Sequence, residues 1–279
     1  MSKQINQPQI VGILNVTPDS FYDGGKYNEL SSARHQLDKI LKEGADIIDI
    51  GAESTRPNAQ ILSAQEEIAR LEKILPIIVQ DIAIFNQQNA KKVKVSIDSY
   101  HFDTIVFAQQ FGIDIVNDIS GLIDDKIINF ISKNKLKTIL MHNLSIHANP
   151  DIIINQQLNV FQEIAYWLNN KIKNLSKYNI DKSQLIFDPG IGFSKNAKQS
   201  INIIKNIEQY QQFGLEIYVG HSNKSFLDAL NFANPNLDRK QKTLALSQYL
   251  ANKGVNYLRV HDVKDNIAAI TAKNPDIFY

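Results

Sequence analysis

The sequence predicts a (β/α)8 barrel, an α/β fold in which eight parallel strands alternate with helices and the active site lies at the C-terminal ends of the strands. Short runs rich in Ile and Val alternate eight times with longer stretches of helical spacing. Most of these runs are almost continuously apolar, as in parallel strands covered on both faces. The length of 279 residues also suits such a barrel, which typically has about 250.

The alternative is an open, doubly wound sheet, but no Gly-x-Gly-x-x-Gly follows the first apolar run, which counts against its dinucleotide-binding form. The expected strands, in chain order, are 10–14, 47–50, 93–97, 115–116, 138–141, 185–187, 217–219 and 257–260. One helix is expected between the second and third strands, because Ser63 and Glu66 form a capping-box pattern and apolar residues then recur at helical intervals to Ile82. Further helical stripes cover 161–175, 201–210 and 267–270.

Composition narrows the class of protein. The net charge is +1 with no basic or acidic block, which argues against nucleic-acid and polybasic membrane partners. The absence of cysteine excludes disulfides, thiolate zinc sites and a cysteine nucleophile. No apolar run reaches the roughly 20 residues of a membrane span, and the polar start does not resemble a signal peptide. We therefore expect a cytoplasmic protein, and because no Pro/Gly/Ser linker divides the chain, one domain over residues 1–279.

Nearly every predicted strand ends in a hydrogen-bonding or charged side chain. Barrel enzymes place their chemistry at these C-terminal ends, whereas strand beginnings such as Gln9 and Lys92 lack this density. The endings are Asn15, Asp49, Asp98, Asn117-Asp118, Met141-His142, Asp188-Pro189-Gly190, Gly220 to Ser225 and Arg259 to Asp262.

Three of these residues suggest a site for a flat heterocycle. Asp98, Asn117 and Asp188 would converge in the barrel mouth from the third, fourth and sixth strands. Ionised Asp only accepts hydrogen bonds, whereas the Asn amide both donates and accepts, which suits a ring with alternating donors and acceptors. A single Asp could instead cap the loop that follows it, but capping does not explain the joint pattern across strands.

Cationic groups near the same mouth suggest an anion. Lys224 follows the seventh strand, and Arg259 and His261 share a face because residues two apart on a strand point to the same side. The arginine fork suits phosphate oxygens. Asn15 offers an oxygen ligand for Mg²⁺, which often binds few protein groups and completes its shell with water and substrate phosphates. Taken singly, Arg259 could pair with a surface carboxylate and Asn15 could merely form a loop.

The segment after the first strand carries more polar chemistry than a turn requires. It contains hydroxyl and carboxyl side chains and ends in Gly24 and Gly25, which give the backbone freedom to move. We therefore expect a ligand-binding loop at the end of the first strand. His35 and His101 fall in helical stretches and are expected to be solvated.

Seven segments of the chain resemble motifs of the dihydropteroate synthase family, in the right order and on the right strands. They are Asn15 to Gly25, Asp49 to Pro57, Ser96 to Asp98, Asn117-Asp118, Asp188 to Phe193, Ser222 to Ser225 and Arg259 to Asp262. The resemblance implies a (β/α)8 barrel, usually dimeric, that joins 6-hydroxymethyl-7,8-dihydropterin pyrophosphate to 4-aminobenzoate in folate biosynthesis. The products would be 7,8-dihydropteroate and pyrophosphate, formed with Mg²⁺ by a dissociative substitution.

The resemblance also implies that residues 17–25 and 54–57 close as a lid that completes the aminobenzoate pocket, and it implies roles for individual residues. The implied catalytic residues are Asp98, Asp188, Lys224 and Asp23. The implied pterin-binding residues are Asp98, Asn117, Met141, Asp188 and Lys224. The implied pyrophosphate-binding residues are Asn15, Thr55, Arg56, Arg259 and His261, with Asn15 as the metal ligand. The implied aminobenzoate-binding residues are Phe21, Thr55, Pro57, Phe193, Lys224 and Ser225.

The chain departs from the family pattern at three places. Asn223 stands where the family commonly has Arg, the loop after Met141 lacks a usual glycine, and Ile191 replaces a frequent Phe. Two other functions share the pterin cradle: a methyltransferase that moves a methyl group from methyltetrahydrofolate to a corrinoid protein, and a catalytically silent pterin-binding barrel. A pyrophosphate site would be superfluous in the methyltransferase, so Asn15, Thr55-Arg56, Arg259 and His261 count against it.

Overall fold

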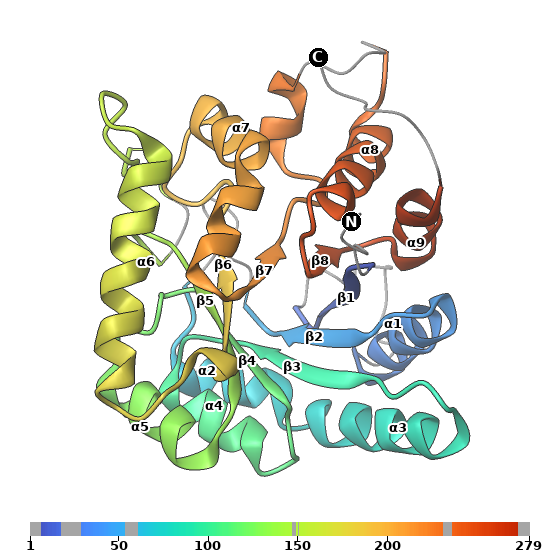
Figure 1. Cartoon of the computed structure of the whole chain (residues 1–279). Coiled ribbons are helices and arrows are strands. Elements are labelled where there is room, and N and C mark those ends of the chain that lie inside the picture. Colours follow the sequence, from blue (N-terminus) through green and yellow to red (C-terminus); the bar gives the residue numbers. More distant parts are fainter. Residues whose placement is uncertain are drawn as a thin grey trace.

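The computed structural model describes residues 7–17, 29–53, 61–146, 149, 151–230 and 236–272. Its eight strands form a closed parallel barrel in which each strand pairs with the next in sequence and β8 pairs with β1 (Figure 1). The strands are β1 (Gln9–Asn15), β2 (Ile47–Gly51), β3 (Lys94–Asp98), β4 (Ile115–Asp118), β5 (Lys137–Met141), β6 (Leu185–Asp188), β7 (Glu216–Val219) and β8 (Tyr257–Val260). This closed barrel confirms the predicted fold class and excludes the open sheet.

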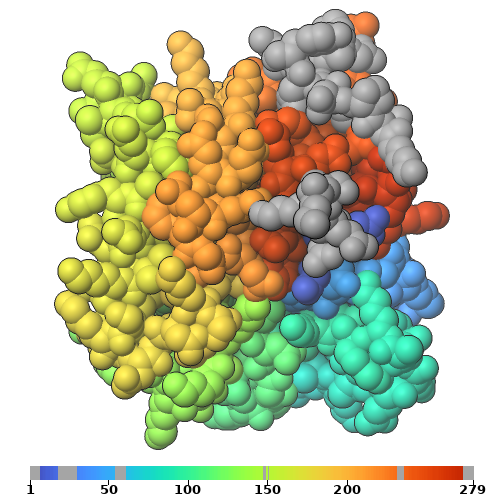
Figure 2. All heavy atoms as spheres, in the orientation of Figure 1, coloured from blue at the N-terminus to red at the C-terminus, as the bar shows by residue number. Residues whose placement is uncertain are grey.

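Helices surround the barrel, with α6 and α3 on opposite flanks of the face seen in Figure 2. The α-helices are α1 (Glu29–Glu43), α2 (Ala64–Leu71), α3 (Leu75–Gln88), α4 (Phe102–Gln109), α5 (Asp125–Asn134), α6 (Val160–Ser176), α7 (Ala197–Lys205), α8 (Arg239–Asn252) and α9 (Val263–Thr271). The described residues also form the 3-10 helices η2 (Lys182–Gln184), η3 (Ile207–Phe213) and η4 (Ser225–Ala229). No helix in the described ranges is long and apolar enough to cross a membrane.

The single helix expected between β2 and β3 is wrong, because the structure has two. The capping box of Ser63 and Glu66 starts α2 as predicted, but α2 ends at Leu71 and α3 begins at Leu75. Pro76 lies in the first turn of α3. Proline has no N–H to donate to the preceding turn, so it is tolerated at a helix start and interrupts a continuous helix.

Two apolar layers hold the barrel. The larger layer lies between the strands and the helices, and a smaller cluster of seven residues fills the barrel interior. The interior residues are Val11, Ile47, Ile115, Ile139, Ile186, Tyr218 and Tyr257. Toward the strand beginnings, Glu216 accepts hydrogen bonds from Lys137 and from the Tyr257 hydroxyl, the latter at 3.1 Å. The interior is therefore filled at this end, and side chains at the opposite end face the barrel mouth.

Candidate active site

The polar strand endings lie next to one another at the barrel mouth. The strand register pairs Asp98 with Asn117, and Met141 with Asp188. Side chains alternate along a strand, so Asn117 points inward, where it hydrogen-bonds with Asp49. The next residue, Asp118, points outward and accepts from Ser120 N at 2.6 Å. The structure thus brings the three residues proposed for a heterocycle to one end of the barrel.

Arg259 joins the carboxylates of this site. Its Nε donates to Asp49 Oδ2 at 2.7 Å and its Nη2 donates to Asp98 Oδ2 at 2.6 Å. Asn117 Nδ2 donates to the same Asp49 oxygen at 3.1 Å. Arg259 is therefore bound at the mouth by the fully buried Asp49 and the mostly buried Asp98, not by a surface carboxylate.

Sequence reasoning noted Asp49 as a strand ending but gave it no role. The signal was present: Asp49 lies two residues from the interior residue Ile47, in an otherwise apolar strand, so it must face the barrel interior. A fully buried carboxylate needs partners, and a cation from another strand is the expected one.

Burial and neighbouring charges together set the protonation of Asp98 and Arg259. Burial raises the pKa of Asp98 to about 7, against the opposing effect of the Arg259 guanidinium. Burial alone would lower the pKa of Arg259, but Asp49 and Asp98 raise it above its usual value. Arg259 stays charged, whereas Asp98 changes protonation near neutral pH.

Asp188 and Lys224 influence each other's charge at the same mouth. Asp188 Oδ1 accepts from Gly190 N at 2.7 Å, so this residue does cap its own loop as well as facing the site. Burial raises the pKa of Asp188 and lowers that of Lys224 to about 8, and in each case the partner's charge opposes the shift. Lys224 Nζ also lies 4.7 Å from the centre of the Phe193 ring.

The loop after β7 places the remaining described candidates. Ser222 Oγ lies 2.9 Å from His261 Nδ1, a contact that the sequence did not predict. Ser225 begins η4 and is exposed. Asn223 is exposed with a φ of 59°, a left-handed conformation that Asn adopts more readily than most residues. The departure from the family pattern at Asn223 thus fits the local backbone.

Asn15 ends β1 beside Gly51 and near Asp98. A Cβ added to Gly51 would lie 3.7 Å from Asn15 Oδ1 and 3.3 Å from Asp98 Cβ, so glycine keeps this corner open. No group of three His, Asp or Glu side chains within the described ranges could hold a metal. The donors present fit Mg²⁺ held by one amide oxygen and completed by water and phosphate, because Mg²⁺ requires few protein ligands.

The predicted site residues Phe21, Asp23, Thr55, Arg56 and Pro57 lie outside the described residues.

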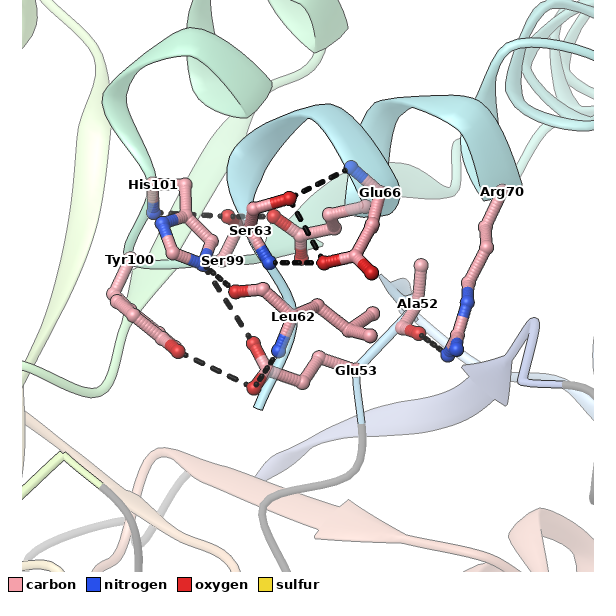
Figure 3. Close-up of polar contacts among 10 residues, drawn as sticks. Ala52, Glu53, Leu62, Ser63, Glu66, Arg70, Ser99, Tyr100 and His101 are labelled. Carbon is pink, nitrogen blue, oxygen red and sulfur yellow. Dashed lines mark hydrogen bonds and ion pairs between the residues drawn. The ribbon is translucent and has the colours of Figure 1, made fainter. Parts of the chain in front are cut away.

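A cluster of polar contacts connects Glu53 and Leu62, which lie on either side of residues 54–60 in the sequence. Figure 3 shows Tyr100 and His101 pointing toward Glu53. Glu53 Oε1 accepts from Leu62 N and from the Tyr100 hydroxyl, each at 3.2 Å. His101 Nε2 lies 3.0 Å from Leu62 O, which can only accept, so Nε2 carries a proton. The expectation that His101 is solvated is wrong, because it precedes α4 and its ring turns into this cluster.

Comparisons with known proteins agree on one family. The pterin binding enzyme family matches residues 11–261. Dihydropteroate synthase of Streptococcus pyogenes serotype M6 is 36% identical over 92% of this chain and 91% of its own length. The structure of dihydropteroate synthase from Anaplasma phagocytophilum with bound 6-hydroxymethylpterin-monophosphate is 32% identical, with a TM-score of 0.83 over 95% of this chain and 98% of that one. That of the Xanthomonas albilineans enzyme with 4-aminobenzoic acid is 28% identical, with a TM-score of 0.81 over 96% of this chain and 92% of that one. The chain therefore belongs to the dihydropteroate synthases within the pterin binding enzyme family, and it is a transferase.

Proposed function

We propose that this chain joins 6-hydroxymethyl-7,8-dihydropterin pyrophosphate to 4-aminobenzoate by a Mg²⁺-assisted dissociative substitution. The observation that carries the proposal is the arrangement of Asp98, Asn117 and Asp188 at the mouth of a closed barrel, with Arg259 and Lys224 among them. The pterin-bound and aminobenzoate-bound relatives support the same pair of substrates.

The pterin would lie against Asp98, Asn117, Met141, Asp188 and Lys224. The carboxylates accept hydrogen bonds from ring N–H and amino groups, whereas Asn117 and Lys224 donate to ring acceptors. Asp98 and Asp188 also place negative charge beside the ring, which favours positive charge that develops there.

The pyrophosphate would bind at Arg259, His261 and Asn15, with Thr55 and Arg56 as expected further donors. Arg259 uses Nε and one Nη2 hydrogen for the carboxylates, and a guanidinium has five N–H donors, so others remain for phosphate oxygens. Mg²⁺ held at Asn15 would supply further neutralisation of the charge on the leaving group.

The reaction breaks the bond between the pterin methylene carbon and the pyrophosphate oxygen, and the electron pair leaves with pyrophosphate. The methylene carbon becomes cationic and shares its charge with the electron-rich ring. The amino nitrogen of 4-aminobenzoate then forms the new C–N bond and loses a proton. The chain's own part is to bind and orient both substrates and to stabilise charge, so no protein nucleophile is needed.

The aminobenzoate would lie beside Phe193, Lys224 and Ser225. The Phe193 ring offers an apolar face next to a cation, which suits an aromatic carboxylate. Phe21, Thr55 and Pro57 remain expected members of this pocket.

We also propose that the protein acts as a cytoplasmic homodimer without nucleic-acid or membrane partners. The near-neutral net charge and the family resemblance support this proposal.

Single-turnover release of pyrophosphate tests the residue roles. We expect Arg259→Ala to slow release by about 100-fold or more, because a donor to the leaving oxygen is lost. Asp188→Ala should also slow release, and Arg34→Ala, which removes an exposed arginine that pairs with Asp81 on α3, should not. Unchanged release in Asp188→Ala or Arg259→Ala would show that these roles are wrong.

A further inference from the structure

Lys195 is a buried ammonium group beside the site that none of the roles above uses. It lies on the loop after β6 and is 7% exposed. Its Nζ lies 2.8 Å from Phe193 O, 3.1 Å from His142 O and 3.0 Å from His142 Nδ1. It therefore joins the loop after β5 to the loop after β6, at His142, which follows Met141, and at Phe193. Met141 and Phe193 are both predicted substrate-binding positions.

These three contacts use the whole donor capacity of a lysine. An ammonium has three N–H donors, and the two carbonyl oxygens can only accept. The third contact therefore requires His142 Nδ1 to accept, which places the ring proton on Nε2. Burial and then the charge of Lys195 hold the pKa of His142 well below its usual value, consistent with a neutral ring.

The two loops do not need a charge to hold them together. Leu144 N donates to Ser194 Oγ at 3.1 Å, Ser194 Oγ donates to Asn143 Oδ1 at 2.9 Å, and Ile154 N donates to Ser194 O at 3.0 Å. Burying a cation is costly unless a nearby anion compensates. Burial lowers the pKa of Lys195 to about 7, and the negative charge of Asp188 opposes this shift. The charge of Lys195 in turn opposes the rise in the pKa of Asp188, although less than the charge of Lys224 does.

We propose that Lys195 is a positioning residue for the pterin site, which fixes the Phe193 and His142 backbones through charged hydrogen bonds. The inference rests on the proposed pterin-binding role of Asp188. Lys224 brackets the same loop from the other side, since its Nζ donates to Ile191 O and lies over the Phe193 ring. Lys195, which is buried, and Lys224, which is partly exposed, thus both hold the turn between Asp188 and Phe193.

Three variants of Lys195 separate charge from hydrogen bonding. Lys195→Met removes both, Lys195→Gln keeps a donor without the charge, and Lys195→Arg keeps the charge. Ser194→Ala is the matched control, because it removes a neutral bond between the same two loops. The readout is the Kd of 6-hydroxymethylpterin by isothermal titration calorimetry, with Tm measured in parallel.

We expect Lys195→Met and Lys195→Gln to raise this Kd by roughly 10- to 100-fold, the range for losing a buried charged hydrogen bond. Lys195→Arg should restore part of the affinity, and Ser194→Ala should change the Kd by less than about threefold while lowering Tm. If Lys195→Met does not fold, the comparison of the Gln and Arg variants carries the same test.

Two failures would be distinguishable. If the wild-type chain does not bind 6-hydroxymethylpterin, the proposed function is wrong. If it binds and the Gln and Arg variants bind equally well, the role of the charge is overturned.

In the wild type, ¹⁵N NMR of His142 should show a neutral ring protonated at Nε2 between pH 5 and 8. Titration of His142 near its usual pKa of about 6.5 would contradict the contact with the Lys195 ammonium.

Discussion

Asp49 offers the sharpest test of how the site is held together. Its Oδ2 accepts from both Arg259 Nε and Asn117 Nδ2, and the side chain is fully buried. Asp49→Ala removes the acceptor for both donors. Asp49→Asn keeps one acceptor oxygen, removes the charge and places an amide NH2 where the unpartnered Oδ1 lies.

The structure sets the expected cost of each change. Removing one partner of a buried ion pair costs about 3–5 kcal/mol in the free energy of unfolding, and Asp98 still holds Arg259, so we expect about 3 kcal/mol for Asp49→Ala. In Asp49→Asn the hydrogen bonds persist but the bond to Arg259 is no longer between opposite charges. Because a charged hydrogen bond is stronger than a neutral one, we expect Asp49→Asn to lower the free energy of unfolding by about 1–2 kcal/mol.

Urea unfolding measures both costs as shifts in midpoint at constant m. The control is Asp81→Ala, which breaks another Arg–Asp pair: Arg34 Nε donates to Asp81 at 2.7 Å, but the two side chains are 55% and 22% exposed. An exposed pair of this kind contributes less than about 1 kcal/mol. If Asp49→Ala were no less stable than Asp49→Asn or Asp81→Ala, the interior network would not stabilise the fold.

Three further predictions concern pH, backbone and metal. Because the pKa of Asp98 is raised to about 7, kcat/KM should fall as pH drops below about 7, and Asp98→Asn should lose this dependence. Because the folded state favours protonated Asp98, the contribution of Asp98 to the free energy of unfolding should decrease as pH rises from about 4 to about 7. The Asp98→Asn variant should not show this decrease. Gly190→Ala should lower the free energy of unfolding in urea by about 2–5 kcal/mol, because the φ of Gly190 is +66° and a Cβ would lie 2.1 Å from His142 O. Gly112→Ala is the control: its φ is +80° but a Cβ would meet no atom within 4 Å, so the cost should be only about 1–2 kcal/mol. Chelating Mg²⁺ should slow pyrophosphate release, and Asn15→Ala should raise the Mg²⁺ concentration needed to restore it; equal requirements in both proteins would contradict the assignment of Asn15.

The barrel could be predicted because its strands are apolar on both faces. In three strands, however, the apolar run ends one residue before the strand itself ends. Asn15, Asp98 and Asp188 therefore belong to their strands, although the sequence pattern placed them in loops. The break between α2 and α3 was missed because helical periodicity continues across it, while Pro76 provided the local signal.

The candidate site was predictable where residues end strands, and less so where they act through others. Asn117 and Asp188 follow from alternation and strand order. Lys195 and Glu53 were missed because their partners, such as His142 and Tyr100, come from other loops whose approach only the closed barrel determines. Sequence spacing does not report contacts of this kind between loops.

Product formation by the purified chain tests the central claim most directly. With 6-hydroxymethyl-7,8-dihydropterin pyrophosphate, 4-aminobenzoate and Mg²⁺, we predict 7,8-dihydropteroate and pyrophosphate in equal amounts, with formation lost when either substrate is omitted and strongly reduced without Mg²⁺. Pterin binding without product would instead indicate a silent pterin-binding barrel and would contradict the proposed reaction.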